Sequence, residues 1–195
     1  METEWARQYG RIADEDISTW GAYGVLGYTP PGWRWSPRFA TEYQFGSGDG
    51  DAADGEHRTF DQLYPTGHLY QGVADRIGWQ NVKDVRAGGT LKPHTKVRLN
   101  LDYFNFWLAN KRDHLYAVNG AVSVRTPQGG AQSSHVGQEA DVVLTWTPAG
   151  HATIGGGLGY FFTGDFLKQT TPGRRHVFTY FFELRFVSHC DQSLR

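Results

Sequence analysis

Residues 94–109, HTKVRLNLDYFNFWLA, decide the fold class, because apolar side chains return at every second position. One face of this stretch, broken only at Asn105, carries Val97, Leu99, Leu101, Tyr103 and Trp107. The other face carries Arg98, Asn100, Asp102, Phe104 and Phe106. A period of two is typical of a β-strand, whose successive side chains point to opposite faces. The segment therefore predicts a strand with one apolar and one largely polar face.

The same alternation recurs along most of the chain. It is clear at 37–46, 81–92, 136–147, 151–162 and 176–186, and weaker at 2–11 and 17–29. No segment shows the 3.6-residue spacing of a convincing amphipathic helix. The pattern predicts an all-β, antiparallel protein with about eight strands.

The connections between these segments alternate between short and long. Short turns fall at 30–36, 92–96 and 148–151, whereas polar stretches rich in Gly and Asp occupy 46–79, 110–134 and 163–175. Transmembrane β-barrels have strands of about ten residues, with short turns at one rim and longer loops at the other. Strands of soluble sandwiches are shorter, about five to six residues on average. The sequence thus favours an up-and-down transmembrane β-barrel over a soluble sheet with one wet face, and it predicts all three long loops at one rim.

Charged side chains recur in the middle of the strands, on the face opposite the apolar side chains. Such charges are costly in a dry core unless they are paired, but a water-filled lumen solvates them. We therefore expect the following residues to line a pore: Arg38, Glu42, Arg86, Arg98, Asp102, Glu139, Asp141, Glu183 and Arg185. The opposite face is expected to meet lipid through Leu99, Leu101, Val142, Leu144, Tyr180, Phe182 and Leu184.

The composition argues against several classes of protein. The 195 residues carry 19 basic and 20 acidic side chains, a formal net charge of −1, so the basic footprint of a nucleic-acid binder is missing. A single cysteine, Cys190, permits no internal disulfide and no Cys-based zinc cluster. Apolar runs are far shorter than the roughly 18 residues that a membrane-spanning helix needs. The first ten residues carry charges where a signal peptide has an apolar core, which predicts no leader in this chain.

Two motifs have both a functional and a purely structural interpretation. The acidic stretch 49–56, DGDAADGE, suits Ca²⁺, but its spacing differs from that of an EF-hand and favours an ordinary solvated loop. The glycines at 155, 156, 157 and 159 lie within a strand pattern, which favours close approach of a loop or ligand over a phosphate-binding turn. No paired-carboxylate, Ser-His-Asp or Cys-His arrangement stands out, so we expect neither an enzyme nor a bound cofactor or metal.

Several blocks of the sequence resemble the alginate-export family of outer-membrane porins. The most specific is the segment 55–81, GEHRTFDQLYPTGHLYQGVADRIGWQN, through His57, Phe60, Asp61, Pro65, Thr66, Gly67, His68 and Trp79. Four further blocks are similar in the same order, WSPRFATEYQFGSGD at 35–49, LANKRDHLY at 108–116, HVGQEADVVLTW at 135–146 and FFTGDFLKQT at 161–170. His57 and His68 with Asp61 offer groups for a metal or acid–base site, but the turn cluster Pro65-Thr66-Gly67-His68 favours a structural role. We therefore expect these three residues to form hydrogen bonds within the loop that fix a folded plug or lid.

The resemblance implies a bacterial outer-membrane protein. In the family's large barrel of roughly eighteen strands, it places these blocks in the C-terminal part. Residues 1–187 would then form a portion of the barrel, and residues 188–195 a C-terminal tail. The partners that it implies are the lipid bilayer of the outer membrane, the outer-membrane assembly machinery and an anionic polysaccharide.

These features together predict a porin-type channel for export or diffusion of an alginate-like anionic polysaccharide or related solutes. The arginines of the polar faces would attract carboxylates, and the five acidic residues of the same faces would temper that attraction. The alternative is a non-conducting structural or adhesive β-barrel whose extracellular loops bind partners. An embedded hydrolase is a further alternative, for which the sequence offers no catalytic motif.

Overall fold

The computed structural model describes residues 1–65, 70–173 and 176–186. In chain order the elements are β1 Glu2–Ile12, β2 Glu15–Tyr28, β3 Arg38–Gly46, β4 Glu56–His57, β5 Val82–His94, β6 Val97–Leu108, β7 Leu115–Tyr116, β8 Val122–Val124, β9 His135–Ala149, β10 Ala152–Thr163, α1 Asp165–Thr170 and β11 Val177–Phe186. The eight long strands match the eight alternating segments, since side chains that point alternately to two environments stabilise an extended chain.

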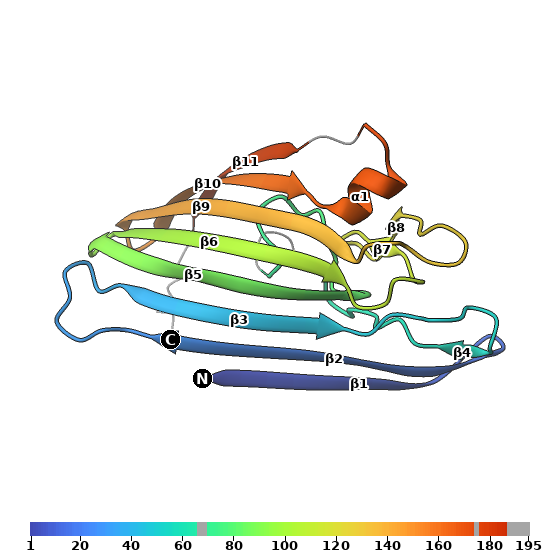
Figure 1. Cartoon of the computed structure of the whole chain (residues 1–195). Coiled ribbons are helices and arrows are strands. Elements are labelled where there is room, and N and C mark those ends of the chain that lie inside the picture. The colour runs from blue at the N-terminus through green and yellow to red at the C-terminus, as the bar shows by residue number, and fades with distance from the viewer. Residues whose placement is uncertain (66–69, 174–175, 187–195) are drawn as a thin grey trace.

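The long strands form one sheet in the order β1-β2-β3-β5-β6-β9-β10-β11, and all neighbours along this path are antiparallel (Figure 1). The short strand β4 pairs with β2 in parallel and completes a nine-stranded sheet within the described residues. The predicted all-β, antiparallel, up-and-down class is confirmed. Within the described part of the chain the sheet is open, with β1 and β11 as its edges.

The long connections gather at one end of the sheet, as the sequence predicts. The segments 47–81, 109–134 and 164–176 all leave the strands at the end on the right of Figure 1. The shorter connections 29–37, 95–96 and 150–151 lie at the opposite end, which we call the short-turn end. An up-and-down sheet requires this separation, because alternate connections emerge at alternate ends.

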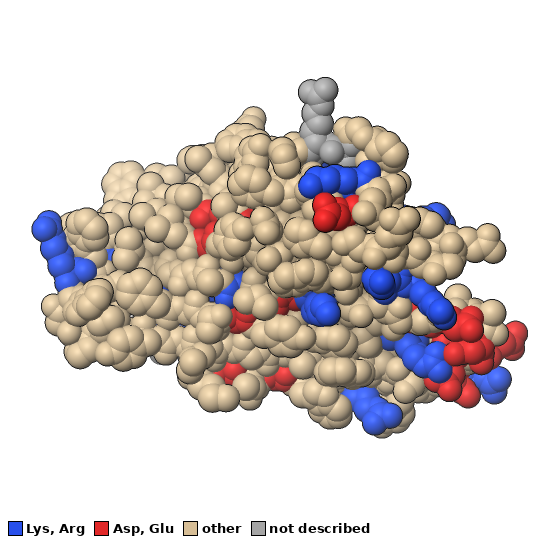
Figure 2. Space-filling view, in the orientation of Figure 1, with Lys and Arg blue, Asp and Glu red and all other residues tan. Residues whose placement is uncertain are grey.

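The register of the sheet aligns like residues of neighbouring strands on one face, which we call the outer face. Leu99 of β6 lies opposite Leu144 of β9, and Leu101 lies opposite Val142. Solvent-exposed side chains of this face include Leu101, Val142, Leu144, Tyr180, Phe182 and Leu184, whereas Leu99 is half-buried. Seen in space-filling form, the visible side of the molecule is mainly uncharged over the strands, and charged side chains gather at the end with the long connections (Figure 2).

The opposite, inner face of the sheet holds the hydrophobic core. Phe104, Phe106 and Leu108 of β6 are buried there among side chains from the long connections. Other members of this cluster are Ala74, Ile77, Val82, Leu115, Val124, Ala131, Val136, Phe161, Phe166 and Leu167. The inner face is therefore apolar where loops cover it and polar along the rest of the strands.

Three small features differ from the sequence expectation. Helix α1 was not expected, because six residues are too few to show a helical period. Burial of Phe166 and Leu167 against the core stabilises it. The two-stranded sheet of β7 and β8 and the strand β4 are also too short to show an alternation of their own.

Candidate functional site

An arginine between two carboxylates occupies the middle of the inner face. Arg86 of β5 donates to Glu42 of β3, with Nη2 2.7 Å from Oε2, and its Nη1 donates to Asp102 of β6. The hydroxyl of Tyr23 donates to the same Oε2 of Glu42 at 3.2 Å. Only 4% of the Glu42 side chain and 21% of that of Arg86 are exposed. The structure thus brings three of the expected pore residues together in an ion-pair network that neutralises the charge of Arg86.

Two further carboxylates of the inner face hold a loop rather than standing open to solvent. Glu139 of β9 accepts a hydrogen bond from the backbone N–H of Ala74 at 2.7 Å. Asp141, two residues along the same strand, accepts one from the N–H of Val73 at 2.9 Å. Both carboxylates are buried. They bind the segment 70–79, which we call the covering loop, to the inner face of the sheet.

Amide side chains add to this attachment. Gln71 donates to Oε1 of Gln44 on β3 at 2.9 Å, and Gln44 donates in turn to the carbonyl of Tyr70 at 3.0 Å. The segment therefore contacts both β3 and β9 and crosses the intervening inner face of β5 and β6. Such an arrangement occupies part of the space that the inner face encloses.

Glycines permit this close approach at two points. Gly72 has φ +86, and a Cβ there would collide with the carboxylate of Glu139. A Cβ on Gly159 of β10 would lie 3.2 Å from the Cβ of Val73. The strand glycines thus include one that leaves room for a loop against the wall.

The stretch 55–81, which resembles the alginate-export family, includes the covering loop and the residues before it. Phe60 is buried, and its ring packs edge-on against Trp79 with centroids 5.5 Å apart. The backbone of Asp61 exchanges two hydrogen bonds with Gln8 of β1. His57, in β4, has Nδ1 3.6 Å from Glu15. Pro65 ends the described part of this stretch, and Thr66, Gly67 and His68 lie outside the described residues.

A second long connection is joined to the first by a buried carboxylate. Asp113 accepts hydrogen bonds from the hydroxyls of Thr59 and Tyr116 and from the backbone N–H of Asp49. Burial, and after it the negative charge of Asp113, raises the pKa of Tyr116 above the ordinary value of a tyrosine. Asp113 thereby connects Asp49 and Thr59 of the first long connection with Tyr116 of the second.

Positive charge gathers on the inner face at the short-turn end. A cavity of about 400 Å³, which we call the basic cup, is lined by Lys92, Thr95, Lys96, Val97, Arg98, Asn100, Thr145, Thr147 and Thr153. No acidic side chain lines it among the described residues. Lys96 donates to the carbonyl of Pro148 at 2.6 Å, and within the described chain Arg98 forms no ion pair. Hydroxyls and cations therefore surround this space, and no described residue supplies a counter-charge.

The remaining expected pore residues lie apart from the cup and the central network. The guanidinium of Arg38, at the start of β3, packs over Gly27 and has no ion pair within residues 1–65, 70–173 and 176–186. Glu183 and Arg185 of the edge strand β11 pair with each other at 2.6 Å and are well exposed. The expected pore residues thus form one buried network, one loop attachment and several separate charges.

The carboxylates of the acidic stretch 49–56 form ion pairs with an arginine that follows it, Arg58. Arg58 contacts Asp54 at 2.6 Å and Glu56 at 2.7 Å. A hydrogen bond from Arg58 lowers the pKa of Asp54. Among the residues that the structure describes, no group of three or more His, Cys, Asp or Glu side chains is arranged to hold a metal ion.

Comparison with known proteins agrees with this architecture. No helix among the described residues is long and apolar enough to cross a membrane. A family model described as alginate export matches residues 1–181. The chain belongs to the alginate-export family. A search of curated proteins finds no match. The resemblance read from the sequence blocks of this alginate-export chain is confirmed, and the family is one of export proteins rather than enzymes.

Sequence reasoning missed several residues of this alginate-export chain that determine its inner face. Lys92 and Lys96 border turns, where their side chains carry no periodic signal, and only the fold brings them beside Arg98. Asp84 lies two positions before Arg86 on the same face of β5, so the strand pattern could have identified it. Its carboxylate is buried and has no hydrogen-bond partner within the described part of the chain. Asp113 lies in an irregular loop, and no local pattern marks it.

Proposed function

We propose that this chain forms part of the wall of an outer-membrane pore for export or diffusion of an anionic polysaccharide of the alginate type. Membership of the alginate-export family and the up-and-down antiparallel sheet support this proposal. The exposed apolar outer face suits contact with lipid, because transmembrane strands alternate between apolar and polar sides. The edges β1 and β11 would pair with further strands to close the wall, since an open edge leaves backbone groups unpaired.

The basic cup is the main observation in favour of an anionic solute. A guanidinium such as that of Arg98 can bind a carboxylate through two parallel N–H···O bonds, and the ammonium groups of Lys92 and Lys96 add charge. A polyuronate presents a carboxylate on each sugar ring. A cup of this kind would therefore bind successive rings in turn as the chain passes.

The pairing of the other charges concentrates the expected selectivity at the short-turn end. Arg86 is neutralised by Glu42 and Asp102, and Arg185 by Glu183. Arg38 and Arg98 form no ion pair within the described residues, so their fields are not cancelled by a contact partner. We expect these two arginines to contribute more to anion attraction than the paired ones.

The covering loop favours the second candidate function, a non-conducting barrel with partner-binding loops. Backbone hydrogen bonds to Glu139 and Asp141 fix the segment 70–79 across the inner face. A loop held in this way narrows the passage. A closed lumen would leave the long connections as the functional part of the molecule.

The test uses titration calorimetry to measure the binding of uronate oligomers to the full chain in detergent micelles. We expect Arg98→Ser to weaken binding about tenfold, because it removes a charge-assisted hydrogen-bonding group. Arg185→Ser is the matched control and should change binding less than about twofold, because Arg185 is already paired. Equal effects of the two substitutions would overturn the assignment of the cup.

Planar-bilayer recordings separate the two candidate functions. A pore should show single-channel steps and an anion-selective reversal potential in a salt gradient, and Arg98→Ser should reduce that selectivity. Cation selectivity of the unsubstituted pore would contradict the proposal. Membrane insertion without conductance would favour the non-conducting alternative.

A further inference from the structure

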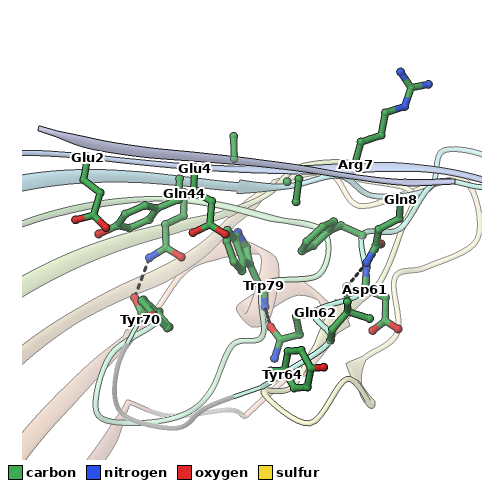
Figure 3. A pocket seen from close by; sticks show the side chains of 16 residues that line it. Glu2, Glu4, Arg7, Gln8, Gln44, Asp61, Gln62, Tyr64, Tyr70 and Trp79 are labelled. Carbon is green, nitrogen blue, oxygen red and sulfur yellow. Dashed lines mark hydrogen bonds between the residues drawn. The ribbon is translucent and has the colours of Figure 1, made fainter.

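A second cavity is separate from the basic cup, and its chemistry is the reverse of that of the cup. It measures about 510 Å³ and lies between the strands β1, β2 and β3 on one side and residues 60–64, Tyr70 and Trp79 on the other (Figure 3). We call it the β1 pocket. Its volume is within the range of about 300–1,000 Å³ that is usual for sites of small ligands. None of its lining residues also lines the basic cup.

Negative charge dominates the described lining of the β1 pocket. Glu2, Glu4 and Asp61 contribute three carboxylates, and none of them has an ion-pair or side-chain hydrogen-bond partner among the described residues. Arg7 also borders the pocket, but Figure 3 shows its guanidinium pointing away from it, on the opposite side of β1. An anion entering this pocket would meet unopposed negative charge. The pocket thus disfavours the solute that the basic cup favours.

Aromatic rings form much of the remaining wall. Tyr23 and Tyr70 meet edge-on with centroids 6.5 Å apart, and Phe60 and Trp79 meet edge-on at 5.5 Å. Tyr64 lines the same space and is exposed. The negative faces of aromatic rings attract ammonium groups, and carboxylates beside them add to that attraction. The combination of free carboxylates with aromatic faces is that of a site for an organic cation.

The amides of the lining are already engaged, which separates a cation from a neutral sugar as the expected ligand. Gln8 bonds the backbone of Asp61, Gln62 bonds the N–H of Trp79, and Gln44 bonds Glu42. A neutral polyhydroxyl ligand is recognised by directional donors and acceptors, and the groups still available here are mainly acceptors with a full charge. An ammonium group uses such acceptors best.

We infer that the β1 pocket binds organic ammonium compounds, with amine-bearing sugars as the class that matches both its carboxylates and its aromatic walls. The ammonium group would lie against Glu2 and Glu4, and the apolar face of the ring against the aromatic side chains. The chain then carries two sites of opposite charge preference on the inner side of one sheet. The β1 pocket does not depend on the pore proposed for polyuronates, because the two cavities share no residue.

The test compares three sugars that share one type of ring but differ in net charge: glucosamine is positive, glucose is neutral and glucuronate is negative. Titration calorimetry of the full chain in detergent micelles should show glucosamine, protonated at neutral pH, binding at least about tenfold tighter than glucose. Glucuronate should bind more weakly than glucose. Methylammonium is a further probe. Weaker binding than that of glucosamine would show a contribution of the ring and support the inference, whereas equally tight binding would overturn the choice of amine-bearing sugars.

Substitutions locate the binding. The double variant Glu2→Gln/Glu4→Gln should weaken glucosamine binding about tenfold, as expected when two solvent-exposed charge partners are lost. Asp165→Asn, an acidic residue of α1 outside the pocket, is the charge-matched control and should leave binding unchanged. Equal affinity for glucose and glucosamine, tightest binding of glucuronate, or an unaffected double variant would overturn the inference. Arg98→Ser should not alter glucosamine binding, so failure of the cup proposal and failure of this one are distinguishable.

Discussion

Removal of the positive charge from the central network is the most direct perturbation of the inner face. In Arg86→Met the aliphatic stem is retained, but Glu42 and Asp102 lose the guanidinium that contacts both of them. The Glu42 side chain is only 4% exposed, so water cannot replace the lost partner well. Breaking a buried ion pair by removing one partner costs about 3–5 kcal/mol. Because 19% of the Asp102 side chain remains exposed, we expect the lower end of that range.

The matched control is an arginine whose ion pair is exposed. Arg185 donates to Glu183 at 2.6 Å, but the side chains are 67% and 47% exposed. An exposed pair contributes about 0–1 kcal/mol, so Arg185→Met should have little effect. The difference between the two variants should therefore be about 2–3 kcal/mol in the free energy of unfolding.

The assay is urea-induced unfolding of the full chain in micelles, followed by tryptophan fluorescence. The triple variant Arg86→Met/Glu42→Gln/Asp102→Asn should regain part of the lost stability, because it no longer leaves unpaired charges against the wall. Loss of stability in Arg86→Met no greater than in Arg185→Met would refute the reasoning. So would a triple variant that is less stable than the single one.

Three further predictions concern the outer face, the covering loop and the second connection. Leu101→Arg should lower the stability in lipid vesicles by about 2–4 kcal/mol, and a membrane-restricted thiol probe should label Leu101→Cys but not Asp102→Cys; the reverse labelling would exchange the two faces. Glu139→Ala should accelerate hydrogen exchange of the Ala74 amide about tenfold, because the hydrogen bond from that amide to the Glu139 carboxyl is lost; unchanged exchange would mean that the bond does not hold the loop. For Tyr116, whose pKa is raised in the folded protein, the stability due to the protonated phenol should be fully present below the ordinary pKa of 10.0 and lost as pH rises through the folded pKa. Absorbance of tyrosinate at alkaline pH, compared with Tyr116→Phe, measures this, and titration of Tyr116 at the ordinary value would contradict it.

Much of the fold could be predicted because a period of two is a local property. Each strand of this sheet is long enough to show its alternation without reference to its neighbours, as in residues 97–108. The lengths of the connections then indicate which of them share a rim. Helix α1 and the short strands β4, β7 and β8 could not be found in this way, because their conformation depends on contacts with the long connections and the sheet.

For the candidate site, the sequence predicted only which face of each strand its residues occupy. Alternation placed Glu42, Arg86 and Asp102 on the polar side of three strands, but it did not show that they would meet. Their contact follows from the register, which puts Glu42 opposite Arg86 across β3 and β5. The basic cup and the β1 pocket combine residues from turns, strand ends and a loop, for which no spacing in the sequence exists.

The long antiparallel strands with one apolar and one polar face, and the membership of the alginate-export family, could both be predicted from the sequence alone. Those properties reside in short-range periodicity and in blocks of consecutive residues. Only the three-dimensional structure shows that Glu139 and Asp141 hold a loop across the inner face, and that within the described residues Arg86 is paired with carboxylates whereas Arg98 is not. The physical reason is that the environment of a charge depends on which groups lie within a few ångströms of it, and the nearest groups here come from segments tens of residues away in the chain.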